Sequence, residues 1–122
     1  MKSVSTRRMY RRIELECHAC ILTSSTLQRC MVRDLSLSGF RVMRQGGEAL
    51  APQTCVMMRV WLPGVPVPID IDQALVRWDR GSECGVEIVS ISNGADFQLA
   101  GFIERALQQS TGWEDAPSQA VG

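Results

Sequence analysis

The chain has 122 residues, enough for one domain with a single hydrophobic core and little room for a second. Its 13 basic and 13 acidic residues cancel, which argues against a general nucleic-acid-binding protein, because such proteins take their affinity from net positive charge. We therefore expect no nucleic-acid polymer among its partners.

Cysteine usage and the N-terminal sequence both favour a cytoplasmic protein. The five cysteines are odd in number and scattered, unlike a disulfide framework. No apolar stretch of signal-peptide length follows the basic N-terminus, and no run approaches the roughly 18 apolar residues of a membrane span. We expect no membrane insertion.

The charges are distributed unevenly. Residues 1–44 carry a net charge of +6 and the remainder a net charge of −6. Twelve of the basic residues are arginines and one is lysine, and arginine suits bidentate phosphate contacts and stacking on planar bases. The basic half therefore indicates a small anionic ligand.

The chain begins with a basic arm, residues 1–12, which has little apolar content and is expected to be flexible. A two-residue alternation of apolar and polar side chains, or a short apolar run between turn residues, then predicts strands. The predicted strands are 13–22, 27–33, 40–43, 55–62, 69–78 and 84–91.

Within 69–78 the apolar phase shifts, which predicts a bulge near Asp72 and Gln73. Six short, antiparallel-looking strands suit a small closed barrel. The predicted fold is mainly β, a six-stranded antiparallel β-barrel with one C-terminal α-helix.

The helix is predicted over 96–109, where apolar residues recur with helical spacing and Asn93 and Asp96 are candidate caps. Its apolar face is expected to cover the mouth or flank of the barrel. We predict one domain over 13–109 and a loose polar tail over 110–122.

Two motifs in this order resemble those of the PilZ domain. Arg8-Met9-Tyr10-Arg11-Arg12 has the R-x-x-x-R spacing, and Asp34-Leu35-Ser36-Leu37-Ser38-Gly39 has the D-x-S-x-x-G spacing. A late hairpin, with Val76-Arg77-Trp78 followed by Gly85-Val86-Glu87-Ile88, extends the similarity to residues 7–108. Arg11 stands where the family often has proline.

The resemblance implies a bacterial receptor for cyclic di-GMP that changes conformation on binding and regulates an effector protein in motility, biofilm or exopolysaccharide pathways. The chemistry agrees, because a carboxylate such as Asp34 can accept both adjacent donors on the Watson–Crick edge of guanine. Ser36 can reach a phosphate oxygen or the guanine edge, and Gly39 allows close approach or a positive φ. The predicted ligand-binding residues are Arg7, Arg8, Arg12, Asp34, Ser36 and Gly39.

Other functions are less favoured. Cys17 and Cys20 form a C-x-x-C around His18, but they point to opposite faces of a strand, so we expect no metal site. No spacing suggests a catalytic triad, so we expect neither an enzyme nor a cofactor, and Trp78 is read as structural. The alternative that stays open is a PilZ-like interaction adaptor that does not bind nucleotide; it is disfavoured because both motifs are intact.

Overall fold

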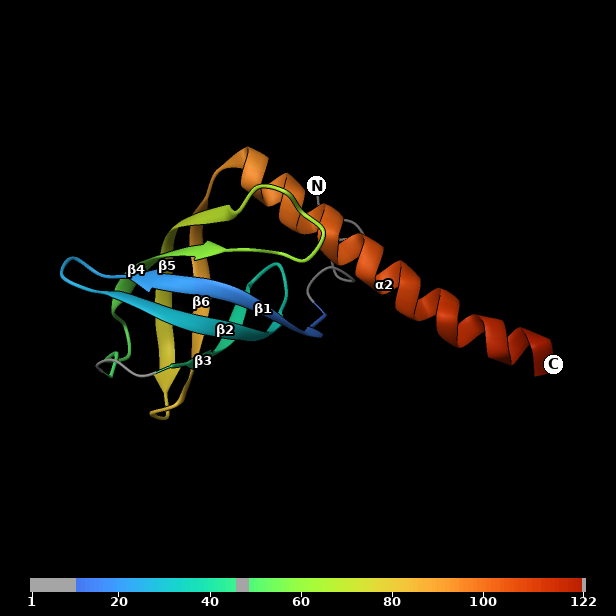
Figure 1. Cartoon of the computed structure of the whole chain (residues 1–122), viewed down its shortest axis with the longest axis horizontal. Helices are drawn as coiled ribbons and strands as arrows, with labels where there is room; N and C mark the ends of the chain where they lie inside the picture. The colour runs from blue at the N-terminus through green and yellow to red at the C-terminus, as the bar shows by residue number, and fades with distance from the viewer. Residues whose placement is uncertain (1–10, 46–48, 122) are drawn as a thin grey trace.

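The strands form a closed antiparallel barrel. A computed structural model describes residues 11–45 and 49–121, with side chains as far as Gln109. Neighbouring strands follow the order β1-β2-β3-β6-β5-β4, with β4 pairing back to β1 (Figure 1). The elements are β1 (Ile13–Leu22), β2 (Leu27–Leu35), β3 (Gly39–Arg44), β4 (Cys55–Val60), β5 (Ile69–Asp79), β6 (Glu83–Ile91) and α2 (Asn93–Val121). The predicted fold class is confirmed.

Alternation along the strands fills the barrel. On β1, Cys17, Ala19 and Ile21 are buried in the core cluster, whereas Glu16 and His18 on the opposite face are exposed. Cys20 shares that opposite face and is buried, but it lies outside the core cluster. The predicted bulge in β5 is present, because the register with β6 shifts on both sides of Gln73. In a regular strand Ile71 and Ala74 would point to opposite faces, and the bulge lets both side chains be buried in the core.

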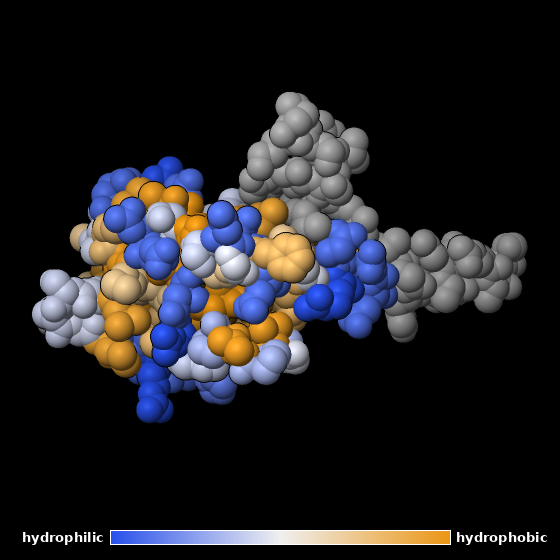
Figure 2. Space-filling view, turned by 90° about the horizontal axis from the view of Figure 1, so that it is seen from above, coloured by the Kyte–Doolittle hydropathy of each residue, from blue (hydrophilic) through white to orange (hydrophobic). Residues whose placement is uncertain are grey.

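Helix α2 lies across one end of the barrel and continues beyond it (Figure 1). Leu99, Ile103 and Leu107 recur every four residues and are buried, so they close that end of the core. Seen from the α2 side, apolar side chains gather in several separate places among polar ones (Figure 2).

The ends of α2 differ from the prediction. Ser92 supplies the cap, since the Ala95 N–H donates to its hydroxyl at 3.2 Å, in place of Asn93 or Asp96. The backbone stays helical to Val121, although we expected a loose tail over 110–122. Gly112 and Pro117 were the reason for that expectation; each weakens a helix, but neither ends this one.

Candidate functional site

Asp34 is the penultimate residue of β2, which continues two residues beyond the predicted strand 27–33. Register shifts occur between Val32 and Asp34 on the β3 side and between Glu14 and Cys17 on the β1 side. Such bulges re-aim side chains. The Asp34 carboxylate is almost buried, with 9% of the side chain exposed.

Two arginines flank the Asp34 carboxylate. Arg41 Nε donates to Asp34 Oδ2 at 2.6 Å, and Arg41 Nη1 donates to Glu83 Oε2 at 2.7 Å. The pKa of Arg41 is raised, mainly by the hydrogen bond to Asp34 and further by the negative charges of Asp34 and Glu83. The charge of Arg41 is therefore compensated by these two acids.

Arg12 contacts Asp34 differently. Its Nη1 lies 2.9 Å from Asp34 Oδ1, yet this oxygen accepts no hydrogen bond from the described residues. The contact is an ion pair by distance only, because Arg12 Nη1 donates its hydrogen bond to the Gly39 carbonyl oxygen, 3.3 Å away. Asp34 Oδ1 is therefore a buried acceptor whose capacity for a hydrogen bond is unused, and such groups are rare in folded proteins.

The loop after β2 is held by its own serines. Ser36 is buried, its N–H donates to the Gly39 carbonyl at 2.9 Å, and the Ser38 N–H donates to Ser36 Oγ at 3.1 Å. The two hydroxyl oxygens lie 2.9 Å apart. The Ser36 hydroxyl therefore stabilises the turn. Ser38 is exposed and lines the neighbouring cavity, although it was not among the predicted ligand-binding residues.

Gly39 is required by the neighbouring strand and not by an unusual backbone angle. It opens β3 opposite Glu87 of β6, and a Cβ on Gly39 would lie 2.2 Å from the Val86 carbonyl oxygen. No real Cβ approaches a backbone atom so closely. The positive φ that we considered does not occur at Gly39.

Replacing Gly39 with alanine should therefore force β3 away from β6. We expect Gly39→Ala to lower the free energy of unfolding by about 1–3 kcal/mol, the usual cost of overpacking. Urea unfolding measures it, with Gly94→Ala as the control because a Cβ at Gly94 meets nothing within 4 Å. Equal midpoints for Gly39→Ala and the wild type would show that the strands can separate freely at this point.

A small cavity of about 240 Å³ adjoins the motif residues. It lies between the entry of the arm, the loop after β2 and the β5–β6 hairpin. Its lining comprises Arg12, Ser38, Gly39, Arg77, Trp78, Gly85, Val86 and Glu87.

Trp78 is half-buried and lines this cavity, so our reading of it as purely structural was incomplete. A Cβ on Gly85 would lie 2.3 Å from Trp78 Nε1, so only glycine lets the indole rest across the hairpin. The Arg80 guanidinium carbon stands 4.9 Å from the centre of the Trp78 ring, a cation–π distance. The tryptophan is thus held between its neighbours and offers an aromatic wall.

The structure brings four of the predicted site residues together: Arg12, Asp34, Ser36 and Gly39. Arg7 and Arg8 lie outside the described residues, as does most of the predicted arm. The cations at the site are compensated by nearby acids, since Arg77 Nε also lies 3.1 Å from Glu87 Oε1. An anionic ligand must therefore compete with resident carboxylates for these arginines.

The described residues give little support to a metal site, a reactive cysteine or a membrane span. No group of three histidine, cysteine or acidic side chains among them is placed to hold a metal ion. All five cysteines are free, and burial raises the pKa of the Cys17 thiol to about 11. No described helix combines the length and apolar character needed to cross a bilayer.

Comparison with known proteins gives one family. The family model for the PilZ domain matches residues 6–105. No curated protein matches the chain.

Two solved structures resemble the fold. The Bacillus subtilis inhibitor of motility, MotI/DgrA, superposes with a TM-score of 0.69 at 20% identity, covering 84% of this chain and 52% of that one. The PilZ domain of CeSA from a cellulose-synthesizing bacterium superposes with a TM-score of 0.60 at 17% identity, covering 85% of this chain and 98% of that one. This chain thus spans about half the length of MotI/DgrA, and at these identities the likeness is one of fold.

Proposed function

The chain belongs to the PilZ domain family, and from this we propose that it is a cyclic di-GMP receptor that regulates an effector protein. The ligand would bind where residues 7–12 meet the loop after β2 and the β5–β6 hairpin. The observation that carries the proposal is Asp34 Oδ1, a buried carboxylate oxygen with unused acceptor capacity beside Arg12. A guanine edge is a planar donor pair that would use this capacity.

Binding requires an exchange of partners at Asp34. The Arg12 guanidinium lies against the carboxylate and is about half exposed, with 51% of its side chain accessible. We infer that guanine donors take its place, while Arg12 turns to a phosphate of the same ligand, with Arg7 and Arg8 adding further phosphate or stacking contacts. Arg41 stays on Asp34 Oδ2 and on Glu83, and so holds the carboxylate in position.

This exchange gives binding a structural consequence. Because Arg12 donates to the Gly39 carbonyl and lies against Asp34, its departure frees the start of β1 from the motif loop. The arm can then order around the ligand and create a surface that an effector protein reads. Amide exchange with and without saturating cyclic di-GMP tests this, with residues 7–12 expected to become protected. Equal protection in both states would move the signal to the barrel or to α2.

The effector class is proposed by analogy. MotI/DgrA is an inhibitor of motility by its name, and we infer a comparable cytoplasmic role for this chain in motility, biofilm or exopolysaccharide control. No catalytic step is proposed, because the charged side chains at the site pair with one another in a way that suits binding.

A second candidate is an interaction adaptor with an idle nucleotide site. The observation that favours it is that Arg12, Arg41 and Arg77 each lie against an acidic partner. In this case the arginines would be structural, and the barrel surface or α2 would bind the partner directly.

Calorimetry separates the two candidates. We expect saturable heat with cyclic di-GMP and none with cyclic AMP or GTP. Arg12→Ala should weaken binding roughly tenfold, the size expected for one charge-assisted contact, and should flatten its salt dependence. Arg59→Ala is a matched control, since Arg59 is also about half exposed and pairs with an aspartate, Asp70, away from the site.

Two outcomes decide against the receptor. Absence of heat and of thermal stabilisation well above micromolar cyclic di-GMP would leave the adaptor as the function. Equal effects of Arg12→Ala and Arg59→Ala would remove Arg12 from the site.

A further inference from the structure

A second, apolar surface lies on the outside of the barrel, on β2, β1 and β4. The strand registers place side chains of equal orientation in rows across these three strands. Leu22 is opposite Leu27 on one side and Met57 on the other, and the next outward row places Cys20 between Arg29 and Arg59. Trp61 follows β4, and its backbone N–H donates to the His18 carbonyl oxygen at 2.9 Å, so the backbone of Trp61 is held beside β1.

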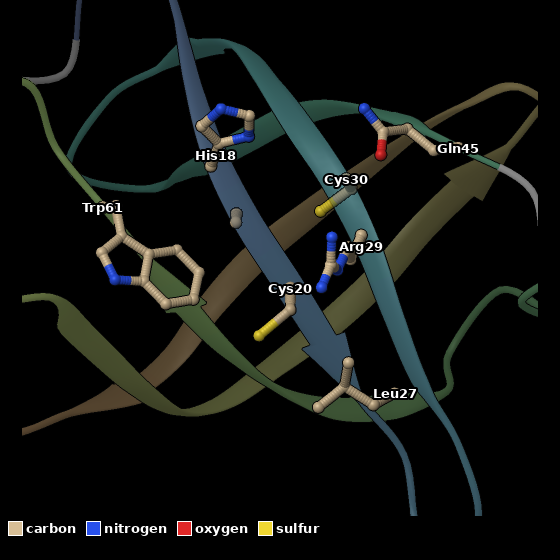
Figure 3. A pocket seen from close by; sticks show the side chains of 8 residues that line it. His18, Cys20, Leu27, Arg29, Cys30, Gln45 and Trp61 are labelled. Carbon is tan, nitrogen blue, oxygen red and sulfur yellow. The ribbon is translucent and has the colours of Figure 1, made fainter.

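This surface is hollowed into a cavity of about 640 Å³, with mainly apolar walls. Figure 3 shows Trp61 on one side, Arg29 and Gln45 on the other, and Cys20 between them. Leu27 and Trp61 stay 61% and 43% exposed, although both are large apolar side chains. A concave apolar site of this size with a few polar groups at its edge is typical of small-molecule pockets.

Arg29 supplies the charge of the cavity. Among the described residues it forms no ion pair, whereas the other arginine of its row, Arg59, pairs with Asp70 through two hydrogen bonds of 2.7 and 3.0 Å. Arg29 is exposed at the rim while Cys20, its partner in the register, is buried beneath. The cavity therefore combines a cation that pairs with no acid of the described chain with an apolar wall, and the complementary ligand has one anionic end and an apolar body.

The surface is separate from the proposed nucleotide site. Leu27 opens β2 and Asp34 lies at its far end, and no residue lines both this cavity and the one beside Gly39. A ligand at Trp61 would leave Asp34 and Arg12 untouched. The two sites can thus be probed independently.

We propose that this cavity binds an apolar monocarboxylic acid, with its acyl or aryl body against Trp61, Leu27 and Cys20 and its carboxylate on Arg29. Burial of the apolar body supplies most of the affinity, and the arginine selects the acid over neutral and cationic analogues. Gln45, at the rim, adds an amide that can donate to the same carboxylate.

Decanoate below its micellar concentration is the probe, and 1-decanol and decyltrimethylammonium are controls of equal chain length. In amide and indole NMR spectra, decanoate should shift the Trp61 indole and the Cys20 and Arg29 amides saturably, and leave the Trp78 indole in place. Trp61→Phe identifies the indole signal. Arg29→Gln should weaken decanoate roughly three- to tenfold and leave decanol unchanged, because only the charge-assisted contact is lost.

Arg33→Gln is the matched control, because Arg33 lies on the same strand and face but outside the cavity, near Glu16. Equal effects of the two arginine variants, or equal binding of decyltrimethylammonium, would overturn the assignment of an acid. Absence of saturable shifts at Trp61 would overturn the site. Concentration-dependent sedimentation that Leu27→Asp abolishes would instead assign this face to a second copy of the chain.

Discussion

Asp34→Asn should reduce cyclic di-GMP affinity by roughly ten- to a hundredfold, which corresponds to the 1.5–3 kcal/mol of hydrogen bonds that involve a charged group. The amide has nearly the shape of the carboxylate, but its NH₂ group would face the guanine donors, so one favourable contact becomes a repulsive one. Preference for cyclic di-GMP over cyclic di-AMP should fall by a similar factor. Calorimetry with both nucleotides measures both quantities.

Asp34→Asn should also lower the stability of the protein. Asp34 is buried in β2 beside two arginines, so its replacement costs some stability, which a loop position would not. Arg41 keeps Glu83 as a partner, so the protein should still fold. Asp70→Asn is the matched control, since it removes an exposed aspartate from an arginine pair elsewhere. Wild-type affinity in Asp34→Asn would show that the carboxylate does not select the base.

The sequence predicts the barrel well because its information is local. Alternating side chains mark each strand, and the phase change near Gln73 marks the bulge in β5. The apolar spacing predicts the helix but not its length. Gly112 and Pro117 are only statistical signals of a helix end, and the backbone stays helical past both.

The site was predicted less completely because its contacts are long-range. The pairing of Asp34 with Arg41 depends on a register shift between Val32 and Asp34 that places Asp34 opposite Arg41, and no local pattern predicts that shift. Trp78 lines the cavity because Gly85 lies against its indole across a hairpin. The signal for this arrangement was a tryptophan opposite a glycine, which is recognised only once the register is known.

The buried pair of Arg44 and Asp79 also has no signal in the sequence, yet it fixes the hairpin that carries Trp78. Arg44 Nη2 donates to Asp79 Oδ1 at 2.9 Å and also to the Gly81 carbonyl oxygen. Asp79 accepts from the Leu50 N–H at 2.6 Å and from the Gly81 N–H at 2.8 Å. The end of β3, the segment before β4 and the β5–β6 turn are therefore joined at one carboxylate.

These contacts also set the ionisation of Asp79. Burial alone would raise the pKa of the Asp79 carboxyl, but the N–H groups of Leu50 and Gly81, together with Arg44, outweigh burial and hold the pKa below its ordinary value of 3.8. A carboxyl whose pKa is lowered by folding stabilises the folded state above its unfolded pKa. That stabilisation is lost as the pH falls through the folded pKa.

Asp79→Asn should therefore lower the free energy of unfolding by about 3 kcal/mol at neutral pH, because it removes the charge that compensates a buried guanidinium. The difference from the wild type should begin to shrink below about pH 4, where the Asp79 carboxyl of the unfolded chain takes up a proton, and should keep shrinking as the pH falls through the lower folded pKa. Asp70→Asn, which breaks an exposed pair, should cost less than about 1 kcal/mol. Urea unfolding followed by tryptophan fluorescence across this pH range measures all three proteins. A difference between Asp79→Asn and the wild type that stays constant down to pH 3 would show that the loss comes from packing and not from the charge of Asp79.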